Sequence, residues 1–170
     1  MDAEEDKLTI LEGILNYHFR DKSLLILALA HSTFAYESQE KEIFDNQRLE
    51  FLGDSILGMV VAEHLYTKYP NFAEGELTRR RSLLVNKNNL ARKAKEINIS
   101  QYLLLGKGEE KRGGRENLAN LSAALEAVIG AIYLDGGFEE AREFIMNKIV
   151  TEPSVNNQMS PDNHEKQGII

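Results

Sequence analysis

Apolar residues recur with a helical period through the middle of the chain, between residues 46 and 68. They fall three or four positions apart, at Leu49, Leu52, Ile56, Met59 and Val60. This is the spacing of a helix with a wide buried face. A proline follows at position 70, and the residue before a proline is disfavoured in helical geometry. The pattern therefore predicts a long helix that ends close to residue 69.

The same period, interrupted by turn residues, predicts further helices on both sides of this one. They are expected over residues 5–19, 22–30, 76–85, 86–97, 118–134 and 138–150, with Asp21 as the N-cap of the second. Residues 100–105 form a short apolar segment. The polar segment 38–45 and the glycine-rich segment 106–115 are expected to be loops. No segment alternates as a strand does, so the expected fold is all-α.

The chain of 170 residues is long enough to bury the core of one domain without added stabilisation from disulfide bonds or a structural metal ion. We expect that domain to occupy residues 1–150. Residues 151–170 contain two prolines and several Asn and Gln residues and have no periodicity. They are expected to be a disordered tail or a truncated linker.

The composition indicates which cellular compartment the protein is expected to occupy. The sequence has no cysteine, which excludes disulfides and thiolate-bound zinc. In the sequence, no stretch approaches the apolar length that is needed to cross a bilayer. The N-terminus is acidic and does not resemble a signal peptide. We therefore expect a cytoplasmic protein that has no membrane partner.

Charge is unevenly distributed along the chain. The formal net charge is −7, which argues against nonspecific binding of polyanions by the chain as a whole. Residues 79–95, however, contain seven Lys and Arg residues and no acid. This block is consistent with a phosphate-binding surface and equally with a solvated helix face.

Three acidic residues are candidates for a metal site. Glu50 and Asp54 stand at i and i+4, so their carboxylates project from one face of the long helix. Such a pair is often only a solvated face, but two adjacent carboxylates also suit a hard cation such as Mg²⁺ or Mn²⁺. Glu126 lies within an apolar helix, where a carboxylate must face a cleft, be paired or bind a metal.

The segment from Asn46 to Leu57, NQRLEFLGDSIL, closely resembles the signature of the ribonuclease III family, the endonucleases that cut double-stranded RNA. Other motifs of the family follow the same order: AHS at residues 30–32, EGELT at 74–78, LGKGE at 105–109 and ALEAVIGAIYLD at 124–135. The resemblance covers nearly all of residues 5–150. It implies the helical endonuclease fold of that family and a homodimer.

The resemblance also implies an active site. Glu50, Asp54 and Glu126 match three acidic residues of the family, of which Glu50 and Glu126 would hold Mg²⁺, with Mn²⁺ as an alternative. Asp54 would orient or deprotonate a water near the scissile phosphate. The family's products carry a 5′-phosphate and a 3′-hydroxyl.

Two positions depart from the family's pattern. Ala123 stands where the family has an aspartate, three residues before Glu126 and on the same helix face. The loss of this ligand is expected to impair or abolish activity. Gln47 stands where the signature usually has glutamate. In the family this position and the acid that matches Glu74 help to engage RNA, and Gln47 keeps its hydrogen-bonding ability.

Other residues have both a structural and a functional interpretation. Phe51 is an ordinary core aromatic by its pattern, whereas the resemblance implies that it inserts into the second copy. His31 is expected to be a hydrogen-bonded structural residue. The family's bacterial enzymes usually carry a following double-stranded-RNA-binding domain, and this sequence ends before one would fit.

Three functions therefore remain open. The first is a Mg²⁺-dependent endonuclease for double-stranded RNA that is impaired at Ala123. The second is a non-catalytic RNA-binding or ribosome-associated protein on the same fold. The third is a helical dimerisation module, in which the acidic trio would be incidental. Retention of all three acids favours the first.

Overall fold

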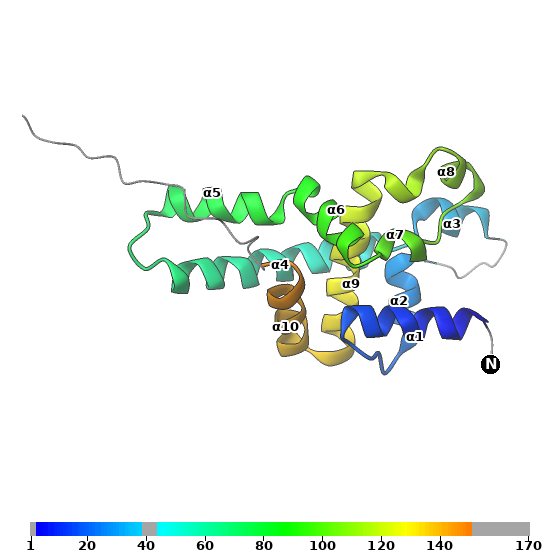
Figure 1. Cartoon of the computed structure of the whole chain (residues 1–170), viewed down its shortest axis with the longest axis horizontal. Coiled ribbons are helices and arrows are strands. Elements are labelled where there is room, and N and C mark those ends of the chain that lie inside the picture. Colours follow the sequence, from blue (N-terminus) through cyan, green and yellow to red (C-terminus); the bar gives the residue numbers. More distant parts are fainter. Residues whose placement is uncertain (1–2, 39–43, 151–170) are drawn as a thin grey trace, which may run out of the picture.

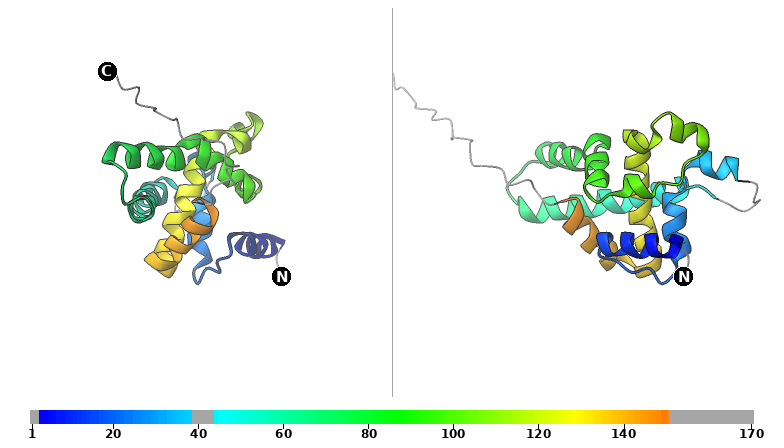
Figure 2. Two further views of the ribbon diagram at one scale, coloured as in Figure 1. Left: turned by 60° about the vertical axis from the view of Figure 1, so that its left-hand side comes forward. Right: turned by 45° about the vertical axis from the view of Figure 1, so that its right-hand side comes forward.

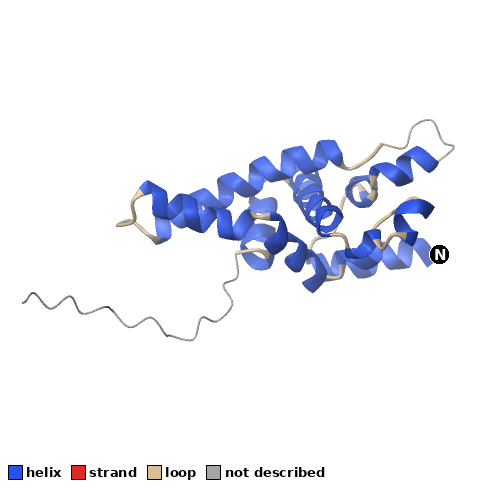
Figure 3. Cartoon of the chain, turned by 90° about the horizontal axis from the view of Figure 1, so that it is seen from above, coloured by secondary structure: helices blue, strands red, loops and turns tan. Residues whose placement is uncertain are grey.

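The computed structural model describes residues 3–38 and 44–150, with side chains from residue 6. Within these ranges the chain is all-α, as predicted, and a single parallel β-bridge joins Ala30 to Leu104 (Figure 3). The helices are α1 (Ala3–Leu15), α2 (Lys22–Leu29), α3 (Ser32–Glu37), α4 (Gln47–Lys68), α5 (Glu74–Val85), α6 (Lys87–Glu96), α7 (Ile99–Tyr102), α8 (Lys107–Lys111), α9 (Leu118–Gly136) and α10 (Phe138–Lys148), with a 3-10 helix η1 (Gly114–Glu116) before α9. The predicted tail, 151–170, lies outside the described residues.

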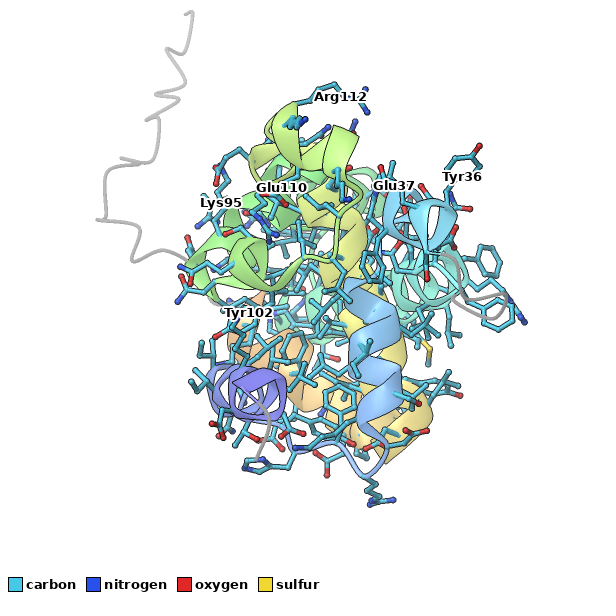
Figure 4. The ribbon with its side chains drawn as sticks, turned by 90° about the vertical axis from the view of Figure 1, so that its right-hand side faces the viewer. Tyr36, Glu37, Lys95, Tyr102, Glu110 and Arg112 are labelled. Carbon is cyan, nitrogen blue, oxygen red and sulfur yellow. The ribbon has the colours of Figure 1, made fainter. Side chains whose placement is uncertain are left out.

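The long predicted helices are all present, but the short helices α3, α7 and α8 and the 3-10 helix η1 were not foreseen. The glycine-rich segment 106–115 was expected to be a loop, and this is wrong, since it contains α8 and η1. The carboxylate of Glu37, at the end of the unpredicted α3, accepts a hydrogen bond from the backbone N–H of Lys107 at 2.8 Å. Figure 4 shows Glu37 beside the segment that carries Glu110 and Arg112. A contact from a residue seventy positions away thus stabilises the start of α8.

Helix α9 is the centre of the domain. It packs against α2, α4, α6 and α10, and its apolar side chains are buried on nearly every side (Figure 1). The prediction that no stretch is apolar enough to cross a bilayer is wrong for α9. By its length and hydropathy alone, this helix could span a membrane. Most of α9 is buried inside the domain, as the core helix of a soluble protein is.

Helices α4 and α5 form a hairpin that projects from the rest of the domain (Figures 1 and 3). No residue of α5 is fully buried. The opposite end of α4 is anchored by Asn46, whose buried side chain donates to the Ala28 carbonyl at 3.2 Å. Its backbone N–H donates to the Ala30 carbonyl at 2.9 Å. The start of α4 is therefore fixed to the end of α2, while its far end extends outward.

The backbones of α4 and α9 touch where the two helices cross. Figure 2 shows α9 running steeply across α4. A Cβ atom on Gly53 would lie 2.6 Å from the carbonyl carbon of Glu126 and closer still to its oxygen. A Cβ atom on Gly130 would lie 3.2 Å from the carbonyl carbon of Leu49 and, again, closer to the oxygen. Only glycine at both positions allows this approach.

We expect Gly53→Ala to force the two helices apart. Because the added methyl group would meet rigid backbone, the free energy of unfolding should fall by about 3 kcal/mol or more. Gly58→Ala is the matched control in the same helix, since nothing lies within 4 Å of its Cβ position. It should leave stability unchanged or raise it by up to about 1 kcal/mol. Urea denaturation measures both, and equal effects of the two variants would contradict the account of the crossing.

Candidate functional site

Helices α4 and α9 cross at Gly53 and Gly130, a contact that we call the glycine crossing. The three predicted acids lie on the two helices next to this crossing. Gly53 lies in α4 between Glu50 and Asp54, and the backbone that it touches in α9 is that of Glu126. Glu50 and Glu126 are half-buried, and Asp54 is exposed at the edge of the crossing. Segments more than seventy residues apart therefore contribute carboxylates to a common site.

The carboxylates interact electrostatically. Burial, followed by the charges of Asp54 and Glu50, raises the pKa of Glu126 from 4.5 to about 7. Burial and the charges of Asp45 and Asp54 raise the pKa of Glu50. In the described part of the chain, none of the three carboxylates has a salt-bridge partner. The site thus concentrates negative charge without a protein cation to balance it.

This donor set suits a hard divalent cation, which prefers carboxylate oxygens. As the side chains are placed, no three acidic or histidine residues of the described ranges stand close enough to hold one ion together. Uncompensated carboxylates repel one another, so a cation is needed to draw them inward. The close approach of the α4 and α9 backbones at Gly53 and Gly130 places the three acids on neighbouring turns of the two helices.

Two further residues lie near these acids: Ala123, on α9 before Glu126, and Asp45, an acid near Glu50 that the sequence did not predict. Ala123 is half-buried one turn before Glu126, and its methyl group supplies no ligand. Ser122 is buried beside it. Asp45, which precedes α4, contributes to the raised pKa of Glu50. Its position next to the N-cap of the helix that carries Glu50 and Asp54 was the signal available in the sequence.

The two residues predicted to engage RNA are not brought together within one chain. Gln47 is exposed at the start of α4, and Glu74 begins α5 beyond the other end of α4. A helix of 22 residues separates them by about 30 Å. The Glu74 carboxylate accepts a hydrogen bond from the Thr78 hydroxyl at 2.6 Å. It lines a groove between α4 and α5 together with Tyr66 and Arg81.

Phe51 and His31 have different roles in the structure. The Phe51 side chain is 77% exposed on α4, so the interpretation as a core aromatic is wrong. His31 is the N-cap of α3, and its Nδ1 atom accepts from the Thr33 backbone N–H at 3.2 Å. This is the structural role expected for a histidine at a helix junction.

Most of the basic block is engaged in ion pairs. Glu76 pairs with Arg79 and Arg80, Glu96 with Arg92 and Lys93, and Glu116 with Lys95. Lys93 is also buried. These pairs favour the interpretation as a helix face over that of a phosphate-binding surface.

The raised pKa of Glu126 makes stability depend on pH. The folded state keeps this proton up to about pH 7, whereas the unfolded chain loses it near pH 4.5. The free energy of unfolding should therefore fall as pH rises through this interval. In EDTA, Glu126→Gln should stabilise the protein at pH 8 but not at pH 4.5, by about 1 kcal/mol after allowing for solvent screening.

Urea denaturation at the two pH values measures this difference. Glu143→Gln, at an exposed position of α10, is the control and should change stability equally at both. If Glu126→Gln left the pH dependence of the wild type unaltered, the proposed electrostatic coupling of the acids would be wrong.

Comparison with known proteins identifies the family. The model of the Ribonuclease-III-like family matches residues 21–152. The chain is 45% identical over 141 residues to Ribonuclease 3 of Pelotomaculum thermopropionicum, an alignment that covers 83% of this chain and 58% of that protein. It is 48% identical over 137 residues to Ribonuclease 3 of Oleidesulfovibrio alaskensis, with 81% and 59% covered. The chain thus spans less than two thirds of these curated relatives.

A solved structure shows the same fold. The nuclease domain of ribonuclease III from Campylobacter jejuni, described with flexibility in a region involved in dimer formation, superposes with a TM-score of 0.76. The two chains are 45% identical, and the match covers 82% of this chain and 93% of the other. The similarity of sequence and the similarity of fold agree over the segment that carries the glycine crossing and its acids. The chain belongs to the ribonuclease-III-like family.

Proposed function

We propose that this chain is the catalytic domain of an endoribonuclease that hydrolyses double-stranded RNA with Mg²⁺ or Mn²⁺. The domain is taken as residues 1–150. The observation that supports the proposal is that Glu50 and Asp54, on α4, both act electrostatically on Glu126, on α9, where the two helices cross. No salt-bridge partner balances these acids within the described residues, and the chain is a member of this family. Carboxylates placed together in this way are suited to divalent-metal chemistry on phosphate esters.

Each acid has a distinct proposed role. Glu50 and Glu126 would hold the cation, and Asp54, the most exposed of the three, would orient or deprotonate a water beside the scissile phosphate. When bound, the metal supplies a water of lowered pKa and neutralises charge on the phosphate oxygens. Cleavage would leave a 5′-phosphate and a 3′-hydroxyl. Gln47 and Glu74 would contact the RNA by hydrogen bonds.

We further propose that Ala123 impairs this activity. A carboxylate at this position would share the helix face of Glu126 and add a fourth anionic ligand. Without it the cation is held less tightly and the water is positioned less well. The absence of this one ligand also favours a second candidate function, a non-catalytic RNA-binding protein on the same fold.

Restoring the carboxylate tests both candidates. Ala123→Asp should increase the cleavage rate of duplex RNA in Mg²⁺ by about 10²-fold or more, because it completes the ligand set. The rate is measured under single-turnover conditions, and the product ends are identified chemically. Ala123→Asn is the matched control, since it has nearly the same shape without the charge, and it should not raise the rate.

The outcomes separate the two functions. Cleavage that is raised by Asp and not by Asn supports an impaired endonuclease. If neither the wild type nor Ala123→Asp cleaves duplex RNA, while both bind it, the endonuclease proposal is wrong and the binding protein replaces it.

We also propose that the chain forms a homodimer through α4. Phe51, Met59 and Tyr66 lie on one face of this helix, and their side chains are 77%, 61% and 75% exposed. An exposed apolar stripe of this kind is typical of an interface. Phe51 itself borders a mainly apolar groove, whose lining also includes the polar residues Asp45, Gln47 and Arg48. The other apolar residues of the groove are Leu24, Leu27, Phe44, Leu49, Leu52 and Leu134. In a two-fold arrangement, each Phe51 would enter the groove of the other copy.

Phe51→Glu should convert the dimer to a monomer, because it places a charge in an apolar groove. Sedimentation velocity at micromolar concentrations measures the change. Tyr36→Glu is the control, since Tyr36 is an aromatic side chain of α3 that is 91% exposed and points outward from the ribbon (Figure 4). A wild type that sediments as a monomer, or equal dissociation by the two variants, would rule out this interface.

A further inference from the structure

An arginine of α5 folds back over the turn that joins α4 to α5. The guanidinium carbon of Arg80 lies 4.6 Å from the ring centroid of Tyr69 and 4.9 Å from that of Phe72. The two rings are stacked on each other, with centroids 4.7 Å apart and planes inclined by 5°. Arg80 also lies 3.4 Å from the Glu76 carboxylate. These four side chains form what we call the Arg80 clamp.

The clamp lies at the start of α5, where side-chain support is sparse. Its N-cap residue, Ala73, provides no side-chain hydrogen bond, and no residue of α5 is fully buried. The Nε atom of Arg80 is buried and forms no hydrogen bond within the described residues, although it lies 3.4 Å from the Glu76 carboxylate with which it forms an ion pair. Burying a guanidinium nitrogen in this way is unfavourable unless the cation gains from the aromatic faces. The geometry therefore indicates that the rings hold Arg80, and that Arg80 holds the turn.

Glu74 is the functional residue closest in sequence to this turn. It is the first residue of α5 and stands between Phe72 and Glu76, both of which belong to the clamp. Its own side-chain contact, to Thr78, lies within α5. The Thr78 hydroxyl can thus orient the carboxylate relative to α5, while the turn and the packing of Leu77 fix the start of α5 relative to α4.

We propose that Arg80 is a positioning residue, which fixes Glu74 for contact with RNA by holding the α4–α5 turn. This role rests on the proposed function, in which Glu74 engages the substrate. Arg80 itself would not touch the RNA. Removal of the clamp should therefore loosen the turn and weaken binding only through Glu74.

Hydrogen exchange tests the clamp directly. The backbone N–H groups of Phe72, Glu76 and Leu77 donate to carbonyls of Tyr69 and Ala73 and close the turn. Arg80→Met should accelerate the exchange of these three amides by at least about fivefold, and Arg80→Lys should restore much of the protection because it keeps a cation over the rings. Arg79→Met is the control, since Arg79 also pairs with Glu76 but has no ring contact among the described residues.

A double-mutant cycle tests whether the clamp acts through Glu74. Binding of a duplex RNA to the full chain is measured by fluorescence anisotropy in Ca²⁺, for Arg80→Met, Glu74→Gln and the double variant. If Arg80 works through Glu74, the double variant should bind no more weakly than Glu74→Gln alone. If the fold-losses of RNA affinity caused by Arg80→Met and by Glu74→Gln multiply in the double variant, Arg80 contacts RNA independently and the positioning role is wrong.

Different results would overturn the Arg80 clamp and the proposed endoribonuclease function. Unchanged exchange of the three amides in Arg80→Met, or equal acceleration in Arg79→Met, would overturn the clamp. Absence of duplex binding by every variant and by the wild type would overturn the proposed function, and the role of Arg80 in substrate contact with it.

Discussion

The contact between the backbones of α4 and α9 is the interaction on which the site depends. Gly53 and Gly130 leave no side chain between the two helices, so the carbonyls of Glu126 and Leu49 approach the glycines of the opposite helix. Helices of ordinary composition pack at 8–10 Å between axes, with side chains interleaved. Here the close approach lets Glu50, on α4, come near Glu126, on α9. Any larger residue at the crossing would separate the acids as well as the helices.

This arrangement is unfavourable by itself. Burial in an apolar core helix, together with the charges of Asp54 and Glu50, raises the pKa of Glu126 to about 7 and so opposes its ionisation. In the described part of the chain, no Lys or Arg pairs with these acids, although Arg79, Arg92 and Lys95 each pair with an acid elsewhere. A fold that tolerates such repulsion has a ready use for a divalent cation, which would balance the charge and draw the side chains together. The methyl group of Ala123 lies on α9 one turn before Glu126, where it provides no oxygen atom.

The parts of the structure that depend on local pattern could be predicted from the sequence. The period of the apolar residues gave α4 and α9, and the motif resemblance gave the three acids. What could not be predicted rests on contacts between distant residues. Glu37 stabilises α8 from seventy positions away, and the burial that raises the pKa of Glu126 depends on the packing of α9. Gly53 and Gly130 were visible as isolated glycines in apolar helices, which is a signal of close packing, but their meeting required the fold.

The central claim is that the crossing holds one divalent cation between α4 and α9. Its most direct test is the crystal structure of the protein with Mn²⁺, with the ion located from its anomalous scattering. The account predicts a peak within bonding distance of the carboxylates of Glu50 and Glu126, close to Asp54, with the Gly53 and Gly130 contacts intact. A Mn²⁺ ion bound elsewhere, while these carboxylates remain turned apart at a neutral or higher pH, would contradict it.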